Sequence, residues 1–201
     1  MREGAYARWG KRVCDRLGVL LLLPLALPLL AMAALLVRLA LGRGVIFRQE
    51  RAGRGGAPFT VLKLRTMAHG AGDDAARLTR VGRWLRASAL DELPQLLNVW
   101  RGEMSLVGPR PLPLDYLPLY TPRQAARLRV RPGLCGLAQA EGRNAVPWEA
   151  RLEWDARYAA RVTLSGDARI ALRCAWVLLR GRGVAAPGHA TMPRFGGDAG
   201  A

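Results

Sequence analysis

Cysteine and histidine are scarce in this sequence of 201 residues, which has three cysteines and two histidines. An odd number of widely spaced cysteines cannot form a complete intramolecular disulfide framework, so a reducing compartment is the simpler interpretation. His69 and His189 are far apart, and no Cys-x-x-Cys or His-x-x-x-His spacing occurs, so the pattern contains no recognisable transition-metal site. Any bound metal should therefore have oxygen ligands, as Mg²⁺ does.

Lysine is also rare, because Lys11 and Lys63 are the only two, whereas arginine is abundant and the formal net charge is +16. Such an arginine excess also arises from a GC-rich genome, so a single arginine carries weight only inside a motif. Hydrophobic residues make up 51% of the chain, which excludes a wholly disordered basic protein. The length suits one globular domain together with a membrane-directed segment.

An uncharged apolar run extends from Leu17 to Val37 and is long enough to cross a hydrocarbon core about 30 Å thick. Pro24 and Pro28 lie inside it, where each removes a backbone donor and favours a bend. Basic residues flank both ends, so the positive-inside rule gives no orientation. The flanking residues are Lys11, Arg12 and Arg16 on one side and Arg38, Arg43, Arg48 and Arg51 on the other.

Three membrane arrangements fit this run. Length alone favours a single spanning helix. A re-entrant helix-hairpin at residues 12–41, broken near Pro28, would place both basic flanks at the same anionic headgroups, and we expect this arrangement. A secretory signal peptide is the third, since residues 31–33 resemble a cleavage site, but the apolar run continues beyond them.

The remainder of the chain predicts a small mixed α/β catalytic domain at residues 42–185, between an N-terminal segment at 1–11 and an irregular tail at 186–201. Two β-branched and aromatic runs, 44–50 and 58–64, are separated by glycines and predict a hairpin. Residues 68–76 and 102–111 read as loops, the latter with a rigid turn at 108–111, and a second rigid turn at 131–133 begins a loop-like stretch that extends to residue 144. Helical spacing predicts helices at 77–90, 92–100, 147–162 and 167–179, the first and last of them amphipathic and suited to a membrane surface.

Asp91 and Glu92 are the candidate reactive residues. Ser88 to Asp91 matches a helix start signal, and a helix N-terminus favours negative charge and can hold a phosphate nearby. An ionised aspartate can attack phosphorus if cations such as Arg86, Arg110 and Mg²⁺ neutralise the phosphoryl oxygens. From the residues alone, a capping Asp91 and a solvated Glu92 are the more common outcome, and Arg110 between two prolines fits a surface turn equally well.

An ordered series of motifs resembles the bacterial sugar transferases called monotopic phosphoglycosyl transferases. The resemblance extends from Lys11 to about Phe195 and is highly specific as a series. Its parts are Lys11-Arg12 with Asp15, the proline at 28, residues 47–53, Lys63-Leu64-Arg65-Thr66-Met67, SALDELPQL at 88–96, GEMSLVGPRP at 102–111, RPG with GLAQ at 131–139, and Gly142-Arg143-Asn144.

The resemblance implies transfer of a sugar-1-phosphate from a UDP-sugar to a polyprenyl phosphate, usually undecaprenyl phosphate, with release of UMP. Asp91 would be the nucleophile, Glu92 the neighbouring acid that positions the acceptor or accepts a proton, and Mg²⁺ would bridge Asp91 and the diphosphate. It implies an enzyme on the cytoplasmic face of the bacterial inner membrane, anchored in lipid. The expected phosphate and substrate contacts are Lys63, Arg65, Arg86, Arg110, Arg131, Arg143 and Asn144.

The chain length matches the minimal form of this family, and the tail around residues 188–197 resembles enzymes acting on UDP-diacetylbacillosamine and related acetamido sugars. Leu27 stands where relatives often have serine, and Glu103, Cys135 and Glu141 also depart from the common pattern. The sugar, the polyprenyl length and a possible homodimer stay open. The rival interpretation is a non-catalytic, membrane-tethered protein that binds anionic lipid or nucleic acid, although no nucleic-acid motif occurs and we expect no such partner.

Overall fold

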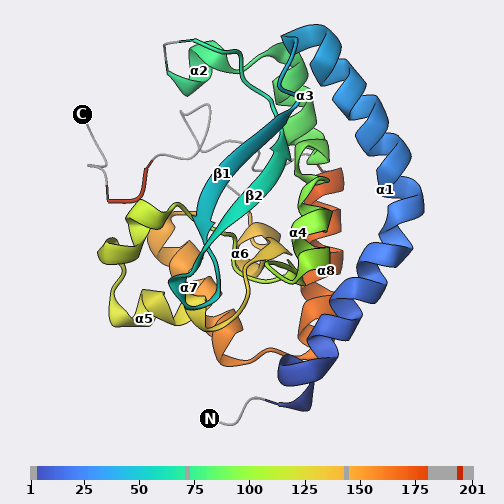
Figure 1. Cartoon of the computed structure of the whole chain (residues 1–201). Helices are drawn as coiled ribbons and strands as arrows, with labels where there is room; N and C mark the ends of the chain where they lie inside the picture. Colours follow the sequence, from blue (N-terminus) through green and yellow to red (C-terminus); the bar gives the residue numbers. More distant parts are fainter. Residues whose placement is uncertain (1–3, 71–72, 143–144, 181–193, 197–201) are drawn as a thin grey trace.

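A small mixed α/β domain lies along one side of a long N-terminal helix, α1 (Lys11–Leu41), in the computed structural model of the chain (Figure 1). The structure describes residues 4–70, 73–142, 145–180 and 194–196. A short π-helical segment, η1 (Tyr6–Gly10), precedes α1, and the combined Tyr6–Leu41 segment is long and apolar enough to cross a membrane. The expected fold class, an apolar N-terminal helix followed by a small α/β domain, is confirmed.

Helix α1 continues without interruption through Pro24 and Pro28, so the predicted break at Pro28 does not occur and the structure shows no hairpin. The helix instead curves around the domain (Figure 1), as expected where prolines remove hydrogen bonds without ending the helix. One face of α1 is buried on the domain, whereas leucines on its other faces are exposed. The buried residues are Lys11, Asp15, Val19, Ala26, Ala33 and Val37.

The N-terminal end of α1 is fastened to the domain by a buried ion pair. Lys11 Nζ lies 2.5 Å from Asp167 Oδ2, and the Tyr6 hydroxyl donates a 2.7 Å hydrogen bond to the same oxygen. We expected Lys11 to face lipid headgroups, and this expectation is wrong because its side chain is almost fully buried. The neighbouring Arg12 is exposed.

Further contacts fasten α1 one turn later and at its C-terminal end. The Asp15 carboxylate accepts hydrogen bonds from the Ser105 hydroxyl at 2.8 Å and from the Leu106 amide at 2.9 Å. At the other end, the Arg65 guanidinium donates to the carbonyl oxygen of Leu41, one of the orphan carbonyls of the last turn. Both ends of α1 are therefore attached to the same domain.

The predicted hairpin is confirmed, with its first strand shifted by two residues. Strands β1 (Ile46–Ala52) and β2 (Pro58–Leu64) pair antiparallel and are joined through η2 (Arg54–Gly56). Asn98 of α4 (Gln95–Arg101) is fully buried against β2, where it accepts a bond from the Leu62 amide and donates to the Thr60 carbonyl. These bonds fix α4 across the hairpin.

The four predicted helices are all present, with shifted bounds. The helix predicted at 92–100 is α4, which begins three residues later. Helices α7 (Trp148–Ala160) and α8 (Leu164–Leu179) agree with the predictions within a few residues. The helix predicted at 77–90 is α3 (Arg80–Ser88), which is shorter at both ends, because Thr79 starts it by accepting a hydrogen bond from the Gly82 amide. A parallel pair, β3 (Ser105–Val107) with β4 (Gly133–Cys135), lies in the region expected to be irregular. The remaining elements are α2 (Asp74–Arg77), η3 (Leu90–Glu92), η4 (Leu114–Leu119), α5 (Pro122–Ala125), η5 (Ala126–Arg129) and α6 (Leu137–Ala140).

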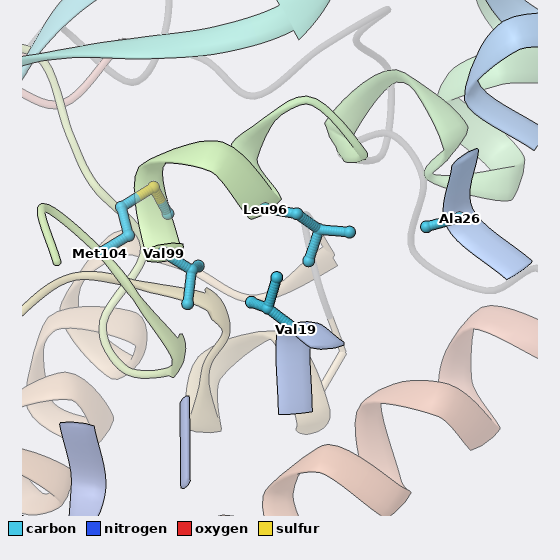
Figure 2. Close-up of a cluster of buried hydrophobic side chains, with 5 residues drawn as sticks. All are labelled: Val19, Ala26, Leu96, Val99 and Met104. Atoms are coloured by element: carbon cyan, nitrogen blue, oxygen red, sulfur yellow. The ribbon is translucent and has the colours of Figure 1, made fainter. Parts of the chain in front are cut away.

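The apolar core joins α1 to the domain. Figure 2 shows Val19 of α1 facing Leu96 and Val99 of α4, with Met104 beside them. A second cluster places Ala33 and Val37 of α1 against β2 and α3. Since each fully buried aliphatic side chain contributes about 1.5–3 kcal/mol, helix α1 is an integral part of this core.

Candidate active site

The two candidate acids lie on a short turn between α3 and α4. Helix α3 ends at Ala89, whose φ of 55° makes it the only non-glycine residue with a positive φ in the described part of the chain. The chain then forms the 3₁₀ turn η3, which contains Asp91 and Glu92, and α4 begins only at Gln95. The predicted capping box does not form, because the Ser88 hydroxyl donates back to carbonyls of α3.

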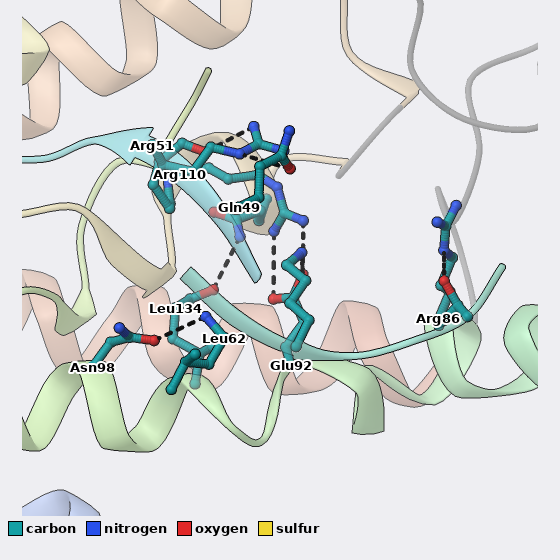
Figure 3. A network of polar contacts seen from close by, with 12 residues as sticks. Gln49, Arg51, Leu62, Arg86, Glu92, Asn98, Arg110 and Leu134 are labelled. Carbon is teal, nitrogen blue, oxygen red and sulfur yellow. Dashed lines mark hydrogen bonds and ion pairs between the residues drawn. The ribbon is translucent and has the colours of Figure 1, made fainter. Parts of the chain in front are cut away.

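Glu92 is held by two cations (Figure 3). Its Oε1 lies 2.9 Å from Lys63 Nζ and 2.7 Å from Arg110 Nη2, and Arg110 Nη1 lies 3.4 Å from Oε2. Burial alone would raise the pKa of Glu92, but Arg110 and Lys63 outweigh it and hold the pKa well below its usual range. Glu92 is therefore the counterion shared by Lys63 and Arg110.

Asp91 has the opposite environment. Asp91 is 6% exposed. Burial, and to a smaller extent repulsion from Glu92, raises the pKa of its carboxyl to about 6. Lys63, Arg110 and Arg86 oppose the rise, so the carboxylate is mostly ionised at neutral pH but close to protonation. A strongly shifted carboxyl beside specific cations in a cavity is typical of a reactive group.

The position of Arg86 is fixed by a neighbour from the end of β2. Its Nε donates a 3.0 Å hydrogen bond to Thr66 Oγ1. Gly82, one turn earlier on α3, permits this approach, because a Cβ there would lie 1.9 Å from the Thr66 carbonyl oxygen. Close packing of α3 on the end of β2 thus brings Arg86 to the acids.

A cavity of about 620 Å³ opens over these residues, within the size range of small-molecule sites. Cations greatly outnumber acids in its lining, which favours an anionic substrate. The cationic residues are Arg51, Lys63, Arg65, Arg77, Arg86, Arg110 and Arg151, and the acids are Asp74, Asp91 and Glu92.

The structure brings five of the expected site residues together: Lys63, Arg86, Asp91, Glu92 and Arg110. The others have different places. Arg65 lines the cavity, but its guanidinium bonds His69 and the last carbonyls of α1. Arg131 does not line it, and its Nη2 lies 3.8 Å from Asp15 Oδ2 beside α1. Arg143 and Asn144 are outside the described residues.

Sequence reasoning missed Arg51, Trp148 and Arg151, which also line the cavity. Arg51 donates to Gln49 Oε1, and the Arg151 guanidinium lies 4.8 Å from the centre of the Trp148 ring. The missed signal was the spacing of Trp148 and Arg151, three residues apart on the first turn of a predicted helix, which places them on one face.

The described residues contain no cluster of three His, Cys, Asp or Glu side chains that could hold a metal by itself. Mg²⁺ commonly binds one or two carboxylates together with substrate phosphates. Glu92 is already engaged by two cations, so Asp91 is the carboxylate at this turn that can supply a protein ligand.

Comparisons with known proteins identify the family of the chain. The family model for bacterial sugar transferase matches residues 6–181. The chain is 42% identical to the uncharacterized sugar transferase EpsL of Bacillus subtilis, over 94% of this chain and 96% of that protein. It is 47% identical to the UDP-glucose:undecaprenyl-phosphate glucose-1-phosphate transferase of Caulobacter vibrioides, over 81% and 67%, and 36% identical to the undecaprenyl-phosphate galactose phosphotransferase of Salmonella typhimurium, over 87% and 41%. The chain therefore belongs to the bacterial sugar transferase family.

Proposed function

We propose that this sugar transferase moves a sugar-1-phosphate from a UDP-sugar to undecaprenyl phosphate, releases UMP, and thereby performs the first membrane step in assembly of a bacterial glycan. The observation that carries the proposal is a buried, nearly neutral-pKa carboxyl, Asp91, in a cation-lined cavity beside a long apolar helix. The names of the relatives from Caulobacter and Salmonella support the same acceptor.

In the first half-reaction, an Asp91 carboxylate oxygen attacks the β-phosphorus of the UDP-sugar. A bond forms between that oxygen and phosphorus, and the bond from phosphorus to the bridging oxygen breaks. The bridging oxygen leaves with the electron pair as part of UMP, so no proton has to move. Lys63, Arg86 and Arg110 neutralise the phosphoryl oxygens that Asp91 approaches. Mg²⁺, held by Asp91 and the diphosphate, would supply further charge neutralisation.

In the second half-reaction, a phosphate oxygen of undecaprenyl phosphate attacks the phosphorus of the aspartyl phosphosugar, and the Asp91 carboxylate is released. The acceptor oxygen is already anionic at neutral pH, so no general base is needed. Glu92 therefore acts as a positioning residue, because its ion pairs hold Lys63 and Arg110 beside the nucleophile.

For the membrane arrangement, we propose a monotopic protein on the cytoplasmic leaflet of the bacterial inner membrane, with α1 entering and leaving the same leaflet. Domain contacts occur near both ends of α1, through Lys11 and Asp15 at one end and Leu41 at the other. A helix that crossed the bilayer in this conformation would draw the charged domain into hydrocarbon, which is strongly unfavourable.

Labelling of single cysteines separates the re-entrant arrangement from a single crossing. In a chain whose three native cysteines are replaced, Ala5→Cys and Arg43→Cys place an exposed thiol before and after α1. The re-entrant arrangement predicts that a membrane-impermeant maleimide labels both thiols only from the cytoplasmic side. Labelling of one from each side would establish a single crossing.

Glucose is the sugar we propose, because the Caulobacter relative is named for UDP-glucose. The acetamido sugars that the tail suggested, diacetylbacillosamine and N-acetylgalactosamine, stay in the comparison, since most of residues 188–197 are outside the described residues. No fold feature in the described part distinguishes these donors.

The decisive experiment measures UMP release by purified protein from UDP-glucose, UDP-galactose and the two UDP-acetamido sugars. Each donor is tested with and without undecaprenyl phosphate and Mg²⁺, and Asp91→Asn is the control. We expect turnover that needs the lipid, Mg²⁺ and Asp91. No turnover with any donor, together with salt-sensitive nucleic-acid binding that survives Asp91→Asn, would favour the non-catalytic binding protein.

A further inference from the structure

Four arginines that line the cavity are not used by the reaction described above. Two of them bond main-chain carbonyls beside the cavity, Arg65 at Leu41 and Arg77 at Ala68, and the other two are Arg51 and Arg151. Arg51 of β1 and Arg151 of α7 both line the cavity, together with Arg110 and Tyr116. Figure 3 shows Arg51 beside Arg110, with Arg86 on the far side of Glu92. Arg51 therefore lies on the Arg110 side of the acidic pair, away from Arg86. Arg151 belongs to the same side, because Arg110 acts on its charge more strongly than any other side chain.

Neither group forms an ion pair with a carboxylate in the part of the chain that the structure describes. Arg51 donates to Gln49 Oε1 and to the Pro111 carbonyl, which are neutral acceptors. Arg151 is only 5% exposed, and its Nη1 is buried without a hydrogen-bond partner among the described residues. Burial and the charge of Arg110 lower the pKa of both guanidinium groups to about 10, so both remain cationic at neutral pH.

Arg51 is half-buried and Arg151 is buried, and although Asp155 acts on the charge of Arg151 from the same helix, no carboxylate of the described residues lies within ion-pair distance of either guanidinium. A desolvated guanidinium without such a partner is unfavourable, and its bidentate geometry is well matched to a phosphate. The proposed reaction contains two sources of phosphate, the nucleotide and the lipid acceptor. Their routes differ. Helix α3, which carries Arg86, packs on α1, whereas α7 packs on α5, η5 and α6 (Figure 1). The acceptor arrives from the lipid around α1, so the α7 side suits the soluble nucleotide.

We propose that Arg51 and Arg151 form a phosphate subsite for the nucleotide, which binds the phosphate that remains on the nucleoside when the sugar phosphate is transferred. This subsite rests on the proposed function and assigns these two arginines to the donor. When the bond between phosphorus and the bridging oxygen breaks, the oxygen leaves with the electron pair, and the two guanidinium groups neutralise the charge gained by UMP.

The test compares binding of UMP and of uridine, which lacks the phosphate, by calorimetry in lipid nanodiscs. The variants are Arg151→Met and Arg51→Met, with Arg151→Lys to restore the charge. The matched control is Arg157→Met, which removes an exposed guanidinium from the same helix. We expect the two Met variants to weaken UMP binding about 10- to 100-fold and to leave uridine binding within about twofold of the wild type. Arg151→Lys should recover part of the loss, and the control should match the wild type.

Kinetics identify the source of the phosphate. The KM for the UDP-sugar should rise with the UMP dissociation constant, while the KM for undecaprenyl phosphate stays unchanged. Unaltered UMP binding in both Met variants would overturn the proposed subsite. If the KM for undecaprenyl phosphate also rises, the two arginines bind the lipid phosphate instead. If circular dichroism shows that Arg151→Met does not fold, the test rests on UMP binding by Arg51→Met. If UMP binding depends on Arg151 but no donor supports transfer, the subsite is supported and the proposed function is refuted. If transfer occurs but UMP binding does not depend on Arg151, the proposed function is supported and the subsite is refuted.

Discussion

Replacing Asp91 by asparagine and Glu92 by glutamine should change the free energy of unfolding in opposite directions. The Asp91 carboxyl has a pKa of about 6 against an ordinary value of 3.8, so the folded protein favours its protonated form more than the unfolded chain does. Asp91→Asn resembles that form at every pH and should stabilise the protein while it abolishes turnover. Glu92→Gln removes the counterion of Lys63 and Arg110 and should destabilise it.

The magnitude follows from linkage. A pKa raised from 3.8 to about 6 corresponds to a loss of about 3 kcal/mol from the free energy of unfolding once Asp91 is ionised. The loss is absent below pH 3.8 and grows between pH 3.8 and 6, where folding requires uptake of a proton that the unfolded chain has already released. It is complete above about pH 6, because both states are then ionised and the folded state must keep a carboxylate in an unfavourable site. Relaxation of the neighbours reduces the effect, so we expect Asp91→Asn to gain about 1–3 kcal/mol at pH 7.5.

Thermal unfolding in nanodiscs, followed by tryptophan fluorescence between pH 4 and 8 with EDTA present, measures both variants. At pH 7.5 the Asp91→Asn midpoint should lie about 3–10 °C above the wild type, and the difference should disappear toward pH 4. Glu92→Gln should unfold below the wild type over this range. An Asp91→Asn midpoint at or below the wild type at pH 7.5 would refute the reasoning that Asp91 is a desolvated carboxyl repelled by its neighbour.

Three further predictions concern the frame of the site. Gly82→Ala should reduce kcat about tenfold or more and lower the free energy of unfolding by about 1–3 kcal/mol, because its Cβ would collide with the Thr66 carbonyl. An unchanged kcat would show that α3 can move without displacing Arg86 from its working position. Asn98→Ala should cost about 2–4 kcal/mol in chemical denaturation, since it leaves buried groups of β2 unpaired, and a loss below about 0.5 kcal/mol would contradict this. Lys11→Met should cost about 3–5 kcal/mol, whereas Arg12→Met, its exposed neighbour, should change stability by less than about 0.5 kcal/mol; equal effects would contradict the buried ion pair.

Local signals were sufficient where one helix face or one turn decides the structure. Helices α7 and α8 follow from their periodic apolar residues, and the hairpin follows from alternating strands around a glycine-rich turn. The parallel β3–β4 pair could not be read in this way. Each strand has three residues, the two lie far apart in the chain, and their pairing depends on the close approach of Gly108 and Gly133.

The sequence predicted that the two candidate acids lie at one turn, but it did not predict the local structure of that turn. The Ser88 to Asp91 spacing is compatible with a helix start, yet Ala89 adopts a left-handed conformation and the acids form a 3₁₀ turn. Glu92 contacts Lys63 on a distant strand and Arg110 on a later loop, so tertiary ion pairs accompany a conformation that the capping signal did not predict. Arg151 was overlooked because an arginine-rich composition makes single arginines uninformative.

The ion pair between Lys11 and Asp167 also constrains the order in which the protein can be made. The two residues are 156 positions apart, and the first and last described long helices meet through them. At about 5–20 residues per second, the ribosome completes Asp167 on the order of ten seconds after Lys11. During that interval Lys11 is an unpaired cation, free to remain among anionic headgroups. Final docking of α1 must therefore wait for the last helix, so a nascent chain lacking α8 should associate with the membrane but not complete its fold.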